Sequence, residues 1–338
     1  MSQTIGRAIG ANEPLVAPDA TRPAPPQWAG VPGRAMPRAR HHTDRAAAER
    51  LLPRGDLGPF QRWFRNLFSR TISKIIMKGW FRITVVNPER FLHEPCVYAF
   101  NHLSWMDPML FLATFPKEPR LYFYGPKQED LKKGRRNRFM WWTGVPVPFS
   151  PLKDDLITSV RYVQAVFDSG GSLAIAPEGS IHVHEGDLLP FEDGAAYLAL
   201  RAGVPIVPVA ITGISAAFFR GRILVRIGEA IRVEGRPSKR NIDHYSAVTW
   251  HAIKAMIAAD RDLPRPSRFE AWLTDLFNDW GPGGREAAAR LRGPDPADVP
   301  IPPRAAPPSE ALPSVAAAGA EAGVVATSSF EVGAPGGR

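Results

Sequence analysis

Hydrophobic residues recur every three or four positions between Phe60 and Met77, and polar residues fill the opposite arc. This spacing predicts an amphipathic helix. The stretch contains no Asp or Glu, and its charged residues are all positive. Two interpretations stay open: a helix lying in the headgroup layer of an anionic membrane, or an ordinary helix that packs its apolar side on the core. The apolar positions are Phe60, Trp63, Phe64, Leu67, Phe68, Ile72, Ile75 and Ile76.

After this helix, short apolar runs alternate with helical periods, which predicts an α/β fold with a mixed sheet layered with helices. The expected strands are 81–86, 96–100, 121–125, 144–149, 172–176, 205–211 and 222–228. The expected helices between them are 108–115, 155–167 and 195–202. Two more helices are predicted from apolar stripes, one around Tyr245 to Ile257, with Trp250 off the stripe, and one around Phe269 to Phe277.

Both ends of the chain lack sustained hydrophobic periodicity and are rich in Pro, Ala, Gly and Arg. Such segments bury too little apolar surface to offset the entropy lost on ordering. We therefore predict disordered tails at 1–55 and 281–338, a membrane-associating helix at 56–80, and a globular domain at 81–280.

The formal net charge of +9 and the pI near 9.9 favour an anionic partner. With no zinc-finger spacing or RNA-recognition signature, we expect a lipid surface and no nucleic acid. The single cysteine, Cys96, excludes an intramolecular disulfide and favours a reducing compartment. No secretory apolar run opens the sequence and no stretch reaches eighteen apolar residues, so any membrane contact is expected to be peripheral.

The stretch "NHLSWMD" places His102 just after a predicted strand and Asp107 at the start of a predicted helix, as the N-cap before Pro108. An imidazole at the carboxyl end of a strand lies where α/β sheets bind ligands. A carboxylate that accepts from it fixes its tautomer, and such a pair can take a proton from an alcohol. The alternative is a helix cap beside a partly buried histidine. Spacing alone does not decide, because His182 and Asp187 share it.

A second cluster, Pro177 to Ser180 ("PEGS"), directly follows another predicted strand. Its tight turn could hold an anionic group with backbone N–H groups and the Ser180 hydroxyl, and Glu178 could accept from a substrate donor. The alternative is that this is only a turn.

Four stretches in order, "NHLSWMD", "PEGS", "PFEDGAAYLALRAG" and "VPIVPVAI", resemble the four blocks of the glycerolipid acyltransferases typified by 1-acylglycerol-3-phosphate acyltransferase. The resemblance spans roughly Phe60 to Arg232. It implies transfer of an acyl group from acyl-CoA or acyl carrier protein to a lyso-glycerolipid hydroxyl, with no other cofactor and no metal. It also implies an acyltransferase domain at 81–280, held peripherally or monotopically on the cytoplasmic face of the cell membrane.

The resemblance implies roles for eight residues. His102 and Asp107 would form the catalytic dyad. The substrate side would comprise Asn101, Ser104, Glu178, Gly179, Ser180 and Lys127.

Two departures from the family pattern concern the acceptor. The family's second block ends in an arginine, where this chain has Phe149 and Ser150, and Ile181 replaces the arginine of the third block. Arginines at those positions suit an acceptor phosphate. Either the basic stretch from Lys127 to Arg138 supplies the charge, or the acceptor is a lyso-lipid with another headgroup, or that stretch is only a solvated loop.

Two rival functions remain open. In a metal hydrolase, His182 and His184 would share one face of an extended segment, completed by Glu185 or Asp187. In a non-catalytic membrane-surface lipid-binding protein, the basic helix and the basic stretch 127–138 would bind the lipid surface.

Overall fold

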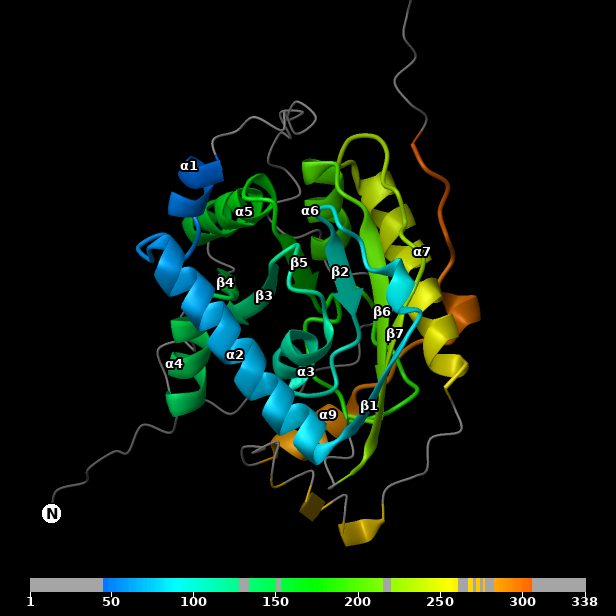
Figure 1. Cartoon of the computed structure of the whole chain (residues 1–338). Helices are drawn as coiled ribbons and strands as arrows, with labels where there is room; N and C mark the ends of the chain where they lie inside the picture. The colour runs from blue at the N-terminus through cyan, green and yellow to red at the C-terminus, as the bar shows by residue number, and fades with distance from the viewer. Residues whose placement is uncertain are drawn as a thin grey trace, which may run out of the picture. The chain divides into compact units, whose positions relative to one another are not determined.

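A single mixed sheet of seven strands organises the fold (Figure 1), with the order β1-β7-β6-β2-β5-β3-β4. The computed structural model describes residues 45–127, 134–149, 153–214, 220–260, 267–269, 272–273, 276 and 283–305. The strands are β1 (Arg82–Val86), β2 (Val97–Phe100), β3 (Leu121–Lys127), β4 (Pro146–Phe149), β5 (Ser172–Ile175), β6 (Ile206–Thr212) and β7 (Arg222–Ile227). All seven predicted strands are present, with ends shifted by one or two residues.

Strands β2 to β6 run parallel to one another. Strand β7 pairs antiparallel with β6, and β1 pairs parallel with β7. The central strands β2, β5 and β6 are buried along their whole length. This is why they read as continuous apolar runs in the sequence. The predicted mixed α/β sheet is confirmed.

Helices cover both faces of this sheet (Figure 1). One core contains α5, α6 and α7, and the other contains α3 and the end of α2. The longer helices are α2 (Pro59–Trp80), α3 (Asp107–Thr114), α4 (Gly134–Thr143), α5 (Lys153–Asp168), α6 (Gly194–Ala202) and α7 (Lys239–Ala258). The short ones are α1 (Arg45–Arg50), α9 (Gly284–Arg290) and the 3-10 turns η2 (Pro88–Arg90) and η4 (Pro296–Asp298). Among the described helices, none combines the length and apolarity needed to cross a bilayer.

Helix α2 turns its polar side toward the protein and its apolar side outward. The residues that it buries are Ser69, Arg70, Ser73 and Met77, so the interpretation of an apolar side packed on the core is wrong. We call the exposed apolar residues the outer face of α2. They are Phe60, Trp63, Phe64, Leu67, Phe68, Ile75 and Ile76, with exposed fractions from 40% to 72%.

The arginines of α2 do not form a free basic side. Arg62 donates to the carbonyl of Glu49 over 2.9 Å, and Arg65 donates to the carbonyl of Trp142 over 2.9 Å. The guanidinium of Arg70 is buried and donates to two carbonyls at the end of α3. These cations therefore hold α2 against its neighbours.

Helix α4 occupies part of the basic stretch, for which a solvated loop was one of the open interpretations. Its Phe139 and Trp142 stack with ring centroids 5.8 Å apart, and Phe68 meets Trp142 edge-on at 5.6 Å. Aromatic side chains of α4 thus continue the outer face of α2.

The predicted limits of both tails are wrong. Helix α1 and the buried Leu52 and Leu57 lie at or near the predicted N-terminal tail boundary. At the other end, residues 283–305 pack on α7 and on the loop after β5: His251 donates to the carbonyl of Val299 over 2.6 Å, and the Gly293 N–H donates to Asp187 over 3.0 Å. Composition did not reveal these contacts because polar groups make them. Residues 306–338 lie outside the described residues.

Helix α7 is buried over a wider arc than its stripe predicts. Trp250, placed off the stripe, is 1% exposed, and its indole N–H donates to the carbonyl of Leu189 over 3.0 Å. Most of the last predicted helix, 269–277, lies outside the described residues.

Candidate active site

His102 and Asp107 meet at the carboxyl edge of the sheet. The Nδ1 atom of His102 lies 2.7 Å from Oδ2 of Asp107. The imidazole is 25% exposed, whereas the carboxylate is fully buried. Because Nδ1–H donates to the carboxylate, Nε2 is left as the basic atom on a ring that solvent can reach.

The environment of Asp107 makes its charge depend on His102. Burial raises the pKa of Asp107 above its usual value, and the hydrogen bond from His102 opposes that shift. Oδ2 also accepts from the Ser104 N–H over 3.3 Å, while Oδ1 is buried without a hydrogen-bond partner. Asp107 is the first residue of α3 and not its N-cap, which is Met106; it still lies at the positive end of the helix.

Asn101 and Ser104, both predicted on the substrate side, have their polar groups engaged inside the protein. The Asn101 amide donates to the carbonyl of Ile211 over 2.8 Å and accepts from its N–H over 2.7 Å. The Ser104 hydroxyl accepts from the Met106 N–H over 3.2 Å. Asn101 thus fixes the end of β2 to β6, and Ser104 shapes the turn that brings Asp107 back to His102.

Glu178 is fully buried and faces the protein. Its Oε1 accepts from the His102 N–H and its Oε2 from the Leu189 N–H, both over 2.7 Å. Gly179 has a φ of 67°, which favours glycine, and is exposed. Ser180 is half-buried. Gly179 and Ser180 thus have surface that solvent can reach, whereas the Glu178 side chain has none.

The basic stretch is described only in part. The side chain of Lys127 and residues Lys132 and Lys133 lie outside the described residues. Arg135 and Arg138 are exposed on α4. A source of positive charge for an acceptor phosphate stays a prediction.

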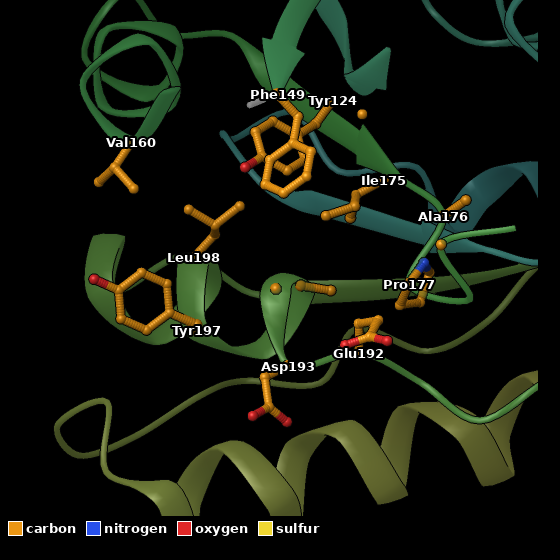
Figure 2. Close-up of a pocket in the computed structure, with 14 residues that line it drawn as sticks. Tyr124, Phe149, Val160, Ile175, Ala176, Pro177, Glu192, Asp193, Tyr197 and Leu198 are labelled. Atoms are coloured by element: carbon orange, nitrogen blue, oxygen red, sulfur yellow. The ribbon is translucent and has the colours of Figure 1, made fainter. Parts of the chain in front are cut away.

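An apolar cavity of about 370 Å³ opens beside the turn after β5. In Figure 2, Tyr124 and Phe149 lie together above it, Val160 and Leu198 lie on one side, and Pro177 lies on the other. Its volume falls in the range of small-molecule pockets. His102 does not line it, but the turn connects the two: Pro177 and Gly179 line the cavity, whereas Glu178 between them bonds to the backbone of His102.

The two histidines of the predicted metal site have separate partners. His182 is fully buried with Nε2 3.0 Å from Oε2 of Glu178, and His184 donates from Nε2 to the carbonyl of Ala289 over 2.7 Å. Asp187 accepts from the N–H groups of Leu188 and Gly293. Within the described part of the chain, no three His, Cys, Asp or Glu side chains are grouped as metal ligands.

Sequence reasoning missed the pairing of Glu178 with His182. Their four-residue spacing was a signal of this pairing. It was not used, because the segment after β5 was interpreted as a loop open to solvent. The Cys96 thiol is buried, and burial raises its pKa to about 11.

Comparison with known proteins identifies relatives along the middle of the chain. Residues 82–212 match the family model "Acyltransferase". The human 1-acyl-sn-glycerol-3-phosphate acyltransferase beta is 30% identical over 185 residues, which cover 49% of this chain and 65% of the human protein. A probable 1-acyl-sn-glycerol-3-phosphate acyltransferase of Mycoplasma pneumoniae is 26% identical, covering 44% of this chain and 56% of its own length.

The chain thus spans between half and two thirds of the length of these relatives. Among solved structures, the 1-acyl-sn-glycerophosphate (LPA) acyltransferase PlsC of Thermotoga maritima aligns with a TM-score of 0.49 and 19% identity. That alignment covers 66% of this chain and 93% of PlsC.

Proposed function

Because this chain belongs to the glycerolipid acyltransferase family, we propose that it transfers a fatty acyl group from a thioester donor to a hydroxyl of a lyso-glycerolipid. The donor is an acyl-CoA or an acyl group bound as a thioester to acyl carrier protein. One observation carries the proposal: a solvent-accessible imidazole whose Nδ1 lies 2.7 Å from a buried carboxylate.

In the proposed reaction, Nε2 of His102 takes the proton of the acceptor hydroxyl as its oxygen attacks the thioester carbonyl. The tetrahedral intermediate collapses, its carbon–sulfur bond breaks, and the departing thiolate receives the proton from the imidazolium. The products are an ester and a thiol, and no side chain is acylated. Asp107 stabilises the transient positive charge on His102 through the Nδ1 hydrogen bond.

Lipid substrates fit two apolar features of the molecule. The cavity between Val160, Leu198 and Phe149 suits a hydrocarbon chain, since its lining is mainly apolar. The outer face of α2 is an exposed apolar surface rimmed by the exposed Lys74 and Lys78. Such a surface fits the interface of an anionic membrane. We therefore propose a peripheral or monotopic position on the cytoplasmic face of a membrane.

The acceptor headgroup is the least constrained part of the proposal. Ile181 replaces the arginine that would suit a phosphate monoester, and it is half-buried. A lyso-lipid with another headgroup is therefore a candidate acceptor beside lysophosphatidic acid.

The test offers purified protein one acyl-CoA and one acyl carrier protein thioester, each with a panel of lyso-lipids with and without a phosphate monoester. Mass spectrometry identifies the product. We expect one diacyl product with the wild type and none with His102→Ala. Liposome binding without acylation of any acceptor would instead favour the non-catalytic lipid-binding protein.

A further inference from the structure

His102 lies just past the end of β2, and another segment of the chain binds its backbone. The last registered pair between β2 and β5 is Ala99 with Ile175, so the ladder stops before His102. Beyond that point, the His102 N–H donates to Oε1 of Glu178 over 2.7 Å. The His102 carbonyl accepts from the N–H of His182 over 3.3 Å. The segment after β5 therefore binds both backbone polar groups of His102.

Both carboxylate oxygens of Glu178 are used inside the protein. Its side chain has no exposed surface. Each oxygen accepts a backbone N–H, one from His102 and one from Leu189. A carboxylate without water is stable only when hydrogen bonds replace its hydration. Its two N–H donors and the nearby His182 ring supply that environment.

His182 adds a third contact to the same carboxylate. Its Nε2 lies 3.0 Å from Oε2, although the alignment falls short of hydrogen-bond geometry, and its ring is 0% exposed. Glu178 and His182 are four residues apart, and both lie on the buried side of the segment between β5 and Leu189. The buried ring lies against the Glu178 carboxylate and leaves that side chain little room to move.

We propose that Glu178 and His182 form a positioning pair that holds His102 for acyl transfer and does not contact the acceptor. The inference rests on the proposed function only for what His102 does; the positioning itself is a property of the fold. Fixing the backbone of residue 102 limits the directions in which its imidazole can point. A displacement of about 1 Å at a catalytic group can cost roughly 10²-fold in rate.

The proposal makes a claim about kinetics that acceptor binding by Glu178 would not make. Glu178→Gln keeps the shape but offers only one acceptor oxygen to two N–H donors. We expect kcat to fall about 10²-fold, with KM for the lyso-lipid unchanged. His182→Leu should lower kcat by roughly 10-fold, and His182→Gln, which keeps a side-chain N–H near Glu178, should recover part of that loss. The control is Glu89→Gln, the same chemical change on an exposed turn.

A second readout does not depend on acyl transfer. The Nδ1 proton of His102, shared with Asp107, should give a downfield proton resonance that His102→Ala lacks. In Glu178→Gln we expect this resonance to shift or broaden while circular dichroism keeps the wild-type spectrum. In Glu89→Gln it should not move.

The outcomes are distinct. A raised lyso-lipid KM with unchanged kcat would show that Glu178 binds the acceptor and would overturn the positioning role, as would an unmoved His102 resonance in Glu178→Gln. If the wild type acylates nothing, the proposed function fails, and the resonance of folded Glu178→Gln still decides the positioning role.

Discussion

Replacing Asp107 by Asn removes a buried charge with almost no change of shape. Two N–H groups, from His102 Nδ1 and from the Ser104 backbone, point at Oδ2. The amide oxygen of Asn should therefore take the Oδ2 position, and its NH2 group the buried Oδ1 position, which has no partner. In this arrangement His102 keeps its tautomer but loses the negative charge that stabilises the imidazolium.

The expected effect on rate follows from this arrangement. General-base catalysis is worth about 10² to 10⁴ in rate, and a preserved tautomer places the loss near the lower end, about 10² in kcat. This corresponds to roughly 2.7 kcal/mol of transition-state stabilisation.

The stability difference between the wild type and Asp107→Asn should depend on pH. The pKa of Asp107 is raised by burial, so the wild type is favoured below the unfolded carboxyl value of about 3.9 and loses stability as pH rises through the folded value. The amide of the Asp107→Asn variant does not titrate, although its buried NH2 costs about 1–3 kcal/mol. The stability deficit of this variant should therefore shrink as pH rises.

Two assays check these expectations. Steady-state kinetics near pH 7.5 give kcat, and urea unfolding near pH 4.5 and near pH 7.5 gives the stability difference. If Asp107→Asn lowers kcat less than about threefold, Asp107 does not stabilise the imidazolium of His102. A stability deficit that grows with pH would contradict the raised pKa of the buried carboxyl.

Three further predictions concern other parts of the molecule. The double variant Trp63→Ser/Phe64→Ser on the outer face of α2 should sediment less with anionic liposomes, because both side chains are exposed. The control Ile157→Ser, at an exposed apolar residue of α5, should bind as the wild type does. Equal binding by the two variants would exclude α2 as the docking surface. Leu198→Trp should fill the cavity beside β5 and shift the preferred acyl chain or lyso-lipid to a shorter one, and an unchanged chain-length profile would show that no chain enters there. Cys96, whose thiol is buried with its pKa raised to about 11, should react with a thiol reagent at pH 8 only as fast as the protein unfolds; rapid labelling of the native protein would contradict this burial.

Much of the fold could be predicted because local pattern and burial agree. Parallel central strands such as β2 and β6 are buried on both faces, so each appears as an apolar run in the sequence. The exceptions arose where polar contacts order the chain. Residues 283–305 carry few apolar side chains, and carbonyls of this segment are bound by His184 and His251.

The site was predictable in part for the same reason. The five-residue spacing of His102 and Asp107 fits a strand, a short turn and a helix, which are local features. The positions of Asn101, Ser104 and Glu178 are different, because each finds its partner only when strands and loops distant in sequence come together, as Asn101 does with Ile211. A polar residue near a site can bind substrate or hold the scaffold, and the sequence does not distinguish the two.

Spacing along the chain was enough to establish the alternation of strands and helices, the four ordered blocks and the nearness of a histidine to an aspartate. The folded arrangement was needed to show which side of α2 faces outward and that Glu178 turns inward to the backbone of His102. Amphipathic spacing gives a helix two sides without saying which neighbour each meets, and the direction of a carboxylate depends on N–H groups that the fold brings to it.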